Sequence, residues 1–464
     1  MTAMRASLAA VPLSNLEGMG WPAIPTPHSA HMLAIQQQLG QSQWWPRTQL
    51  RDWQFRQLRP LFEHASRTVP FYAAHLASAG YRPGQEIDEE FWRRLPLLTR
   101  LDLRKAGAAI RSTDVPRAHG KIAETDTSGS TGTPIKVPKT EAEQLVWSSL
   151  ALREELWHRR DWHAKVAVIR ASGNATTGQH MPNWGSPLAG IFATGPVSAF
   201  EIRSDVVRQA EWLRREDPDY LLTFGTNVVF LCEEFRARGW RLPRLREVRT
   251  VGEVIEPETR RLCREVWGAG ITDIYSCEEA GYLAFQCPEA EGYHVQMEGS
   301  LVEVLDESGA SCAPGKTGRV VVTTLHNYAM PLLRYELGDV AEVGGPCPCG
   351  RGLEVLTRMV GRARDQVRLP NGEKRYAWQS PKKLAEIEPI LRYQVAQVAL
   401  DELEVRLVAT RKLTPEEEDA FRRAVVANLG YDFRFRFVYR RDIPRAPGGK
   451  YFVFRSELEV PAPG

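Results

Sequence analysis

The sequence lacks the features of several large protein classes. No run approaches the about 18–20 apolar residues that cross a bilayer, so no transmembrane helix is predicted. The short apolar run at residues 8–13 contains Pro12 and no clear cleavage site follows it, so no signal peptide is expected. Seven cysteines in 464 residues are too few for a disulfide scaffold. We therefore expect a cytoplasmic protein with reduced thiols.

An excess of one charge is also missing. The 60 basic residues stand against 57 acidic ones, which leaves a formal net charge of only +3. Proteins that grip nucleic acid or anionic membranes usually carry a clear positive excess, so neither partner is expected. The 43% share of hydrophobic residues is that of an ordinary globular chain with a sizeable core.

Short β-branched runs alternate with helical patterns in the first part of the chain. Apolar residues at steps of three and four predict helices over residues 49–80 and 141–160. The runs at residues 166–169, 245–251 and 271–275 are typical of buried strands between helices. This alternation predicts an α/β fold for a large domain, and hairpin strands further on predict a β-rich part.

A smaller α+β unit is predicted at the C-terminus. Two strands flank residues 401–402, and Thr414 with Pro415 and Glu417 forms a well-formed helix start. Gly430 is expected just past the end of that helix. The predicted division is a flexible arm over 1–45, a large domain over 46–361 and a small domain over 362–464.

Residues 127–136 carry the sharpest local signal. They hold five hydroxyl side chains, two glycines and Lys136. Glycines let backbone N–H groups close on an anion, while hydroxyls and the lysine add donors and charge. The Walker A order is absent, so the ordinary P-loop fold is not implied. On composition alone, a polar turn is an equally good interpretation.

Five segments in the same order resemble the motifs of the adenylate-forming superfamily, which includes acyl-CoA synthetases, adenylation domains and luciferases. Together they are far more specific than any one alone. Residues 58–81 and 95–103 further resemble the N-terminal helices of the phenylacetate-CoA ligase group. The five segments are residues 127–136, 275–279, 333–339, 361–365 and 443–450.

The resemblance implies a role for each matching residue. The phosphate loop would hold the β- and γ-phosphates of ATP, Glu279 would hold Mg²⁺, and Lys450 would bridge the attacking carboxylate and the α-phosphate. Arg364 would be the hinge about which the small domain turns. The loop residues are Thr127, Ser128, Gly129, Ser130, Thr131, Gly132 and Lys136, and the expected contacts to adenine, ribose and α-phosphate are Gly252, Glu253, Tyr275, Asp339 and Arg362. Taken singly, each of these charged residues also fits an ordinary solvated position.

Two positions depart from the superfamily pattern. Glu278 replaces the usual Thr before the metal-binding Glu279, and Ser276 stands where Gly is usual. The extra carboxylate puts negative charge near the triphosphate. A nucleotide-binding homologue that has lost catalysis is therefore an alternative, against which the presence of Lys450 argues.

Three cysteines and a histidine form a second constellation. Cys287, His294, Cys347 and Cys349 supply the ligands of a closed tetrahedral site for structural Zn²⁺. The alternative is a set of reduced cysteines and a surface histidine. Relatives in the phenylacetate-CoA ligase group have a similar arrangement.

The predicted function is ATP- and Mg²⁺-dependent activation of a carboxylic acid, with transfer to coenzyme A. An aryl or arylacetic acid is expected in a pocket between residues 171 and 226, where His180, Trp184 and Phe224 are candidates. The alternative acceptors are an amine, a sugar or the thiol of a separate carrier protein, and adenylylation of a phenolic cofactor is a further alternative. Because such relatives are often dimers, a homodimer is also expected.

Overall fold

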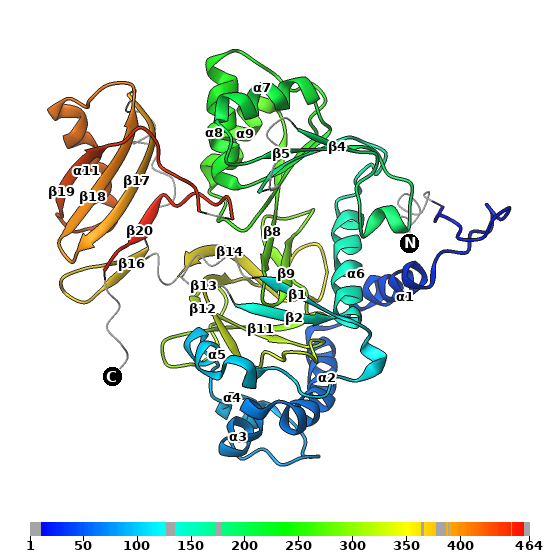
Figure 1. Cartoon of the computed structure of the whole chain (residues 1–464). Coiled ribbons are helices and arrows are strands. Elements are labelled where there is room, and N and C mark those ends of the chain that lie inside the picture. The colour runs from blue at the N-terminus through cyan, green and yellow to red at the C-terminus, as the bar shows by residue number, and fades with distance from the viewer. Residues whose placement is uncertain are drawn as a thin grey trace.

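Helices cover both halves of a long mixed sheet in the main body of the protein (Figure 1). The computed structural model describes residues 11–126, 135–171, 178–362, 366–376, 387, 389–446 and 448–458. The helices of the main body are α1 (Pro27–Ser42), α2 (Arg47–Thr68), α3 (Pro70–Ser78), α4 (Glu89–Arg94), α5 (Arg100–Ala106), α6 (Glu141–Trp157), α7 (Val206–Glu216), α8 (Gly225–Ala237) and α9 (Pro257–Trp267).

The main sheet has a half with parallel strands and a half with antiparallel strands. Its 12 described strands run in the order β11-β12-β13-β14-β10-β9-β8-β7-β6-β3-β5-β4. Neighbours from β8 to β5 are parallel, whereas β9 to β14 pair antiparallel. The strands are β3 (Val166–Arg170), β4 (Gln179–Met181), β5 (Val197–Glu201), β6 (Tyr220–Thr223), β7 (Glu247–Val251), β8 (Gly270–Cys277), β9 (Gly281–Gln286), β10 (Tyr293–Val295), β11 (Ser300–Leu305), β12 (Thr317–Thr324), β13 (Tyr335–Val343) and β14 (Val355–Arg362). A separate hairpin joins β1 (Ile122–Asp126) to β2 (Lys136–Thr140).

Each half of the sheet has its own apolar core. Side chains of α7, α8 and α9 pack on the parallel strands, where Trp212, Phe235 and Val248 are buried. The helices α2 to α4 pack on the antiparallel strands, where Phe62 and Trp92 are buried. The predicted α/β fold with a β-rich part is confirmed, because the parallel strands alternate with helices and the antiparallel ones do not.

The expectation of a flexible arm over residues 1–45 is wrong for its second half. Residues 27–42 form α1, which Thr26 caps and Pro27 begins. Its Met32 and Leu39 are buried, and the helix lies beside α6. The three prolines before and at its start hid this helix, although Pro at the first helical position is favourable.

The C-terminal part forms a small sheet with a core of its own, orange and red in Figure 1. The strand order is β19-β18-β17-β20, and α11 packs on it through Phe421 and Val425. Thr414 and Glu417 form the predicted capping box, and Gly430 follows the helix with φ +65°, so this helix prediction is confirmed. The elements are β17 (Ile390–Ala399), β18 (Glu402–Ala409), α11 (Pro415–Leu429), β19 (Arg434–Tyr439) and β20 (Phe454–Ser456), and a hairpin of β15 (Gln366–Arg368) and β16 (Lys374–Tyr376) precedes them.

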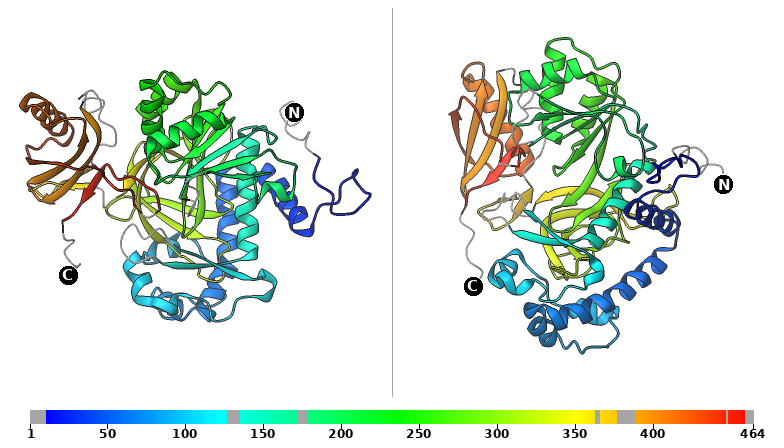
Figure 2. Two further views of the ribbon diagram at one scale, coloured as in Figure 1. Left: turned by 45° about the horizontal axis from the view of Figure 1, so that its top comes forward. Right: turned by 45° about the vertical axis from the view of Figure 1, so that its right-hand side comes forward.

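The chain between β19 and β20 leaves the small sheet and reaches the main body (Figures 1 and 2). Among its described residues, two hydrogen bonds hold it there. Arg445 Nη2 donates to Asn227 Oδ1 over 2.7 Å, and the Tyr451 amide donates to Glu253 Oε1 over 3.2 Å. Among the described helices, none is long and apolar enough to span a membrane.

The guanidinium of Arg153 in α6 links the N-terminal helix to the main sheet. Its Nη2 donates to the Leu39 carbonyl and to Glu298 Oε1, each over 2.7 Å. Its Nη1 lies 3.0 Å from Glu298 Oε2, which makes the pair bidentate. The Arg153 side chain is 0% exposed, so removing it leaves a buried carboxylate without its counter-ion.

We therefore expect Arg153→Ala to destabilise the protein by about 3–5 kcal/mol, the usual cost of breaking a buried ion pair from one side. The shift in the urea unfolding midpoint measures it. Arg59→Ala is the matched control, because the Arg59–Glu86 pair is exposed and should contribute less than about 1 kcal/mol. Equal midpoints for the two variants would contradict the structural role of Arg153.

Candidate active site

A cavity of about 640 Å³ opens where the parallel strands end. Carboxyl ends of β3, β6, β7 and β8 form one wall, and α6 and the segment around Lys450 form others. Ligands of open α/β sheets bind at this edge of the strands. The lining residues include Arg100, Trp147, Leu150, Arg170, Leu222, Phe224, Arg249, Val251, Gly252, Glu278, Glu279, Tyr282, Gly299, His326, Arg362 and Lys450.

Lys450 enters this cavity from the C-terminal part of the chain. A Cβ placed on Gly252 would lie 3.1 Å from both Cε and Nζ of Lys450, so the lysine rests against the glycine backbone. Burial lowers the pKa of the Lys450 amine, and Arg362 lowers it further. Two residues that the sequence singled out nearly 200 positions apart therefore meet in one place.

Glu253 holds this arrangement but does not line the cavity. Its Oε2 accepts from the Thr226 amide over 2.8 Å, and its Oε1 accepts from the Tyr451 amide over 3.2 Å. The carboxylate thus joins the start of α8 to the residue after Lys450. The sequence predicts Glu253 as a contact of the adenine pocket, and in the structure its carboxylate accepts two backbone amides.

Tyr275, Asp339 and Arg362 form a connected group beside the cavity. The Tyr275 hydroxyl donates to Asp339 Oδ2 over 3.0 Å, and Arg362 Nε lies 3.2 Å from Asp339 Oδ1. Antiparallel pairing of β13 and β14 sets Asp339 directly opposite Arg362. Burial and the Asp339 charge both raise the pKa of Tyr275, so this hydroxyl stays protonated and acts as a donor.

Glu279 faces an arginine that the sequence did not single out. Arg100 Nη1, at the start of α5, donates to Glu279 Oε1 over 3.0 Å. Both residues line the cavity. Arg100 lies within the segment 95–103, which resembles the phenylacetate-CoA ligase group, but that resemblance implies no role for this arginine.

Of the predicted phosphate loop over residues 127–136, the structure describes only the last two residues. Thr127, Ser128, Gly129, Ser130, Thr131 and Gly132 lie outside the described residues, as does the hinge candidate Arg364. Lys136 is described, but its ammonium is 3.6 Å from Glu124 and its side chain is 61% exposed. It does not line the cavity.

The apolar part of the cavity lies between α6 and the main sheet. Trp147 stacks on Tyr282 with ring centroids 5.0 Å apart and planes at 10°. Gly281 and Gly299 make room for this wall. A Cβ on Gly281 would meet Trp147 Cδ1 at 3.0 Å, and one on Gly299 would meet Leu150 Cδ1 at 2.8 Å.

Of the three acid-pocket candidates, only Phe224 lines the cavity. His180 is 66% exposed on the edge strand β4, and Trp184 donates from Nε1 to the Ala164 carbonyl. The sequence missed Trp147 and Leu150, because their spacing on α6 is the same as that of a buried core face.

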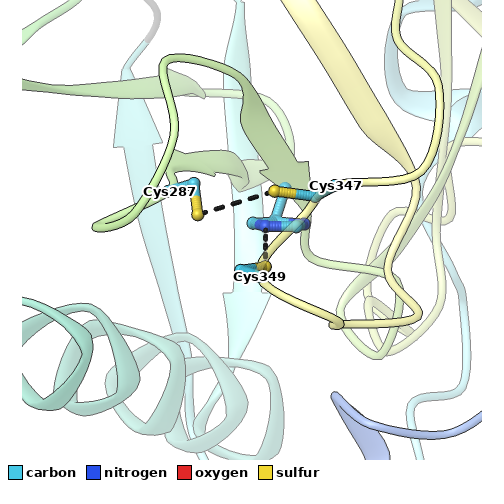
Figure 3. Close-up of side chains that lie close together, drawn as sticks. Cys287, Cys347 and Cys349 are labelled. Carbon is cyan, nitrogen blue, oxygen red and sulfur yellow. Dashed lines mark hydrogen bonds between the residues drawn. The ribbon is translucent and has the colours of Figure 1, made fainter.

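The predicted metal ligands come together near the C-terminal end of α6, where the Trp157 ring packs edge-on against His294. The ligand atoms of Cys287, His294, Cys347 and Cys349 all lie within 4.8 Å of one another. Figure 3 shows the sulfur of Cys347 facing that of Cys287, and the sulfur of Cys349 facing a ring nitrogen. The Sγ atoms of Cys287 and Cys347 are 3.8 Å apart, and Cys349 Sγ is 3.2 Å from His294 Nε2. Burial lowers the pKa of His294 to about 4, so its imidazole is neutral, as a metal ligand must be.

The comparisons with known proteins agree with this architecture. No family model matches the chain. A crystal structure of 2-hydroxyisobutyryl-CoA ligase in its postadenylation state superposes with a TM-score of 0.69 at 19% identity, over 90% of this chain and 92% of that one. For the same ligase in its thioesterification state, the TM-score is 0.59. The fold is thus that of the adenylate-forming ligases.

The sequence relatives narrow the group. The phenylacetate-CoA ligase of Thermus thermophilus is 27% identical over 87% of this chain and 96% of its own length. The phenylacetate-CoA ligase of Escherichia coli K12 is 24% identical over 88% of this chain and 94% of its own length. The resemblance to the adenylate-forming superfamily, and within it to the phenylacetate-CoA ligase group, is confirmed.

The contact between Gly252 and Lys450 yields a prediction. Gly252 has φ +79°, so Gly252→Ala adds backbone strain of about 1 kcal/mol and a methyl group against the Lys450 amine. We expect a lower melting temperature than wild type and displacement of Lys450. Gly239→Ala is the control, because Gly239 has φ +64° and open space around its Cβ position. An equal drop in both variants would mean that Lys450 does not rest on Gly252.

Proposed function

We propose that the protein activates a carboxylic acid with ATP to an acyl-adenylate, releases pyrophosphate and transfers the acyl group to coenzyme A. The observation that carries the proposal is the convergence of Lys450, Arg362 and Glu279 in one cavity at the carboxyl ends of the parallel strands. The similarity to phenylacetate-CoA ligases over most of both chains supports it.

The residues of the cavity have separate tasks in this reaction. Lys450 neutralises the charge that grows between the attacking carboxylate and the α-phosphate. Its lowered pKa reflects how much water the site excludes, which strengthens that interaction. Asp339 accepts hydrogen bonds from the ribose hydroxyls, and Arg362, held 3.2 Å from Asp339, lies near the phosphate.

The metal-binding carboxylate needs a rearrangement. Mg²⁺ bound at Glu279 would neutralise charge on the departing pyrophosphate. Because Glu279 Oε1 accepts from Arg100, the arginine competes with the cation for that oxygen. In our proposal Arg100 turns from Glu279 to the triphosphate when ATP enters.

The acid is aromatic in this proposal. The stacked Trp147 and Tyr282 form a flat wall, and the two glycines let Trp147 and Leu150 pack closely against the main sheet. Flat rings pack well against such walls. An aryl or arylacetic acid would place its ring here and its carboxylate toward Lys450.

We also propose that the small domain over residues 362–464 turns between the two half-reactions, about a hinge at Arg364. Its separate apolar core supports a rigid unit, and the segment carrying Lys450 touches the large domain through few polar contacts. Such a rotation moves Lys450 away after adenylation. The cytoplasmic location and the homodimer stay predictions.

The four-residue cluster fits a structural zinc ion. Tetrahedral Zn–S bonds of about 2.3 Å place two sulfurs about 3.8 Å apart, and the Cys287–Cys347 distance is 3.8 Å. Three thiolates and one neutral imidazole leave no open position. The ion would tie the turn after β9 to the loop between β13 and β14. Asp339 lies on β13, the strand that leads into this loop.

The function is tested by pyrophosphate release with ATP, Mg²⁺ and a panel of aryl and arylacetic acids. Wild type should release pyrophosphate only with its acid and form thioester when CoA is added. Lys450→Ala should lower release by about 100-fold or more, since such electrostatic groups contribute about 10²–10³ in rate. Hydroxamate without thioester would indicate an amine, sugar or carrier acceptor. Unchanged release in Lys450→Ala would contradict the assignment of Lys450.

Zinc is tested by metal analysis of the purified protein. We expect about one equivalent in wild type, and loss of zinc with a lower melting temperature in Cys349→Ser. Cys312→Ser is the control, because Cys312 lies outside the cluster. Wild type that carries no metal and keeps its melting temperature in a chelator would overturn the zinc proposal.

A further inference from the structure

Arg170 is a cavity residue without an assigned role. It ends β3 and lines the cavity together with Gly252 and Lys450. Its guanidinium carbon lies 4.2 Å from the centre of the Phe224 ring. Within the described part of the chain, the Arg170 guanidinium forms no hydrogen bond and no ion pair, while the Arg170 carbonyl accepts from the Ile202 amide.

Phe224 connects Arg170 to the lysine segment. Its ring lies 3.8 Å from the Cβ position of Gly252 and 3.2 Å from that of Gly449. The Phe224 ring and the Lys450 amine thus both lie beside Gly252, and Arg170 and Lys450 line the same cavity. Stacking on an aromatic face orients an arginine while its N–H groups stay available to an anion.

Most other arginines at this cavity already have a carboxylate partner. Arg100 pairs with Glu279, and Arg362 pairs with Asp339. Arg249 binds both Glu154 and Glu155, at 2.7 and 2.8 Å. Arg170 thus adds a positive charge that nothing in contact with it neutralises among the described residues.

The carboxylate that departs from the superfamily pattern lines the same cavity. Glu278 follows β8, and its side chain is exposed. The charges of Glu253 and Glu278 act on Arg170 and partly offset the lowering of its pKa by burial. Both Glu253 oxygens already accept backbone amides, whereas Glu278 is exposed and accepts no hydrogen bond from the described residues.

We propose that Arg170 binds the α-phosphate beside Lys450, and that the Glu278 carboxylate, which lines the same cavity without contacting Arg170, offsets the Arg170 charge through space before nucleotide binds. The acidic residue at position 278 is then balanced by the basic residue at position 170. This proposal rests on the proposed adenylation site, but it makes a claim about phosphate binding that can be tested without knowing the acid.

The test compares AMP with adenosine, because only AMP carries the α-phosphate. Calorimetric titration of Arg170→Ala should show AMP binding weaker by about 10-fold or more, the range for hydrogen bonds to charged groups, with adenosine binding unchanged. Arg170→Lys should keep part of the AMP affinity. Arg214→Ala is the control, because Arg214 also stacks on an aromatic ring, that of Trp240, outside the cavity.

Glu278→Gln tests the balance of charges. In the Arg170→Ala background the carboxylate is unbalanced, so Glu278→Gln should recover a large part of the lost AMP affinity. In the wild-type background it should change AMP affinity much less. An equal effect in both backgrounds would show that the two residues are not coupled and would overturn the pairing.

Two results would overturn phosphate binding by Arg170. One is AMP affinity within threefold of wild type in Arg170→Ala, and the other is an equal loss for AMP and adenosine, which indicates a merely structural role. A wild type that binds AMP, shows the Arg170 dependence and yet releases no pyrophosphate would uphold this inference while the proposed ligase activity fails.

Discussion

One carboxylate holds the two parts of the active cavity together. Glu253 accepts the Thr226 amide with one oxygen and the Tyr451 amide with the other. The first amide belongs to the main body and the second directly follows Lys450. Hydrogen bonds to a charged acceptor are stronger than neutral ones, so this contact fixes where the lysine enters the cavity. The contacts of Lys450 with Gly252 and of Gly449 with Phe224 lie beside this hydrogen bond.

A buried ion network fixes the opposite wall. Arg160 in the turn after α6 binds Glu154, Glu155 and Glu247, at 2.6, 3.0 and 2.8 Å. Burial by itself raises the pKa of Glu154, but Arg160 and Arg249 together lower it to about 2. The carboxylate therefore stays ionised in the folded protein. Through Arg249, the network joins α6 to β7 beside the stacked Trp147.

Local rules were enough to predict much of the fold. The capping box at Thr414 and the Gly430 stop give α11 almost to the residue, because both act within one helical turn. The apolar runs at residues 166–169, 245–251 and 271–275 likewise predicted strands of the parallel half, because each run is a local pattern. The helix α1 was missed because its burial depends on Arg153 and α6, which lie more than a hundred residues away.

For the site, too, the sequence predicted some residues and not others. Ordered motifs indicated that Lys450, Gly252 and Glu279 would share one cavity, since each motif carries its own chemistry. Motifs did not indicate that Arg100 and Arg170 would join them, because an arginine in a short segment looks like any surface charge. The sequence did not indicate the contact between Glu253 and the Tyr451 amide, because only the fold brings these two residues together.

The missing side chains of Gly281 and Gly299 have a consequence for how such a protein could diversify. Each glycine faces one large residue of α6, and a methyl group on either glycine would push that residue toward the cavity. Gly281 at the start of β9 and Gly299 before β11 thus control the depth of this part of the cavity. Neither glycine is among the residues proposed to bind nucleotide. A single substitution of either glycine could therefore shift the preferred substrate to a smaller acid, while the residues proposed for adenylation stay unchanged.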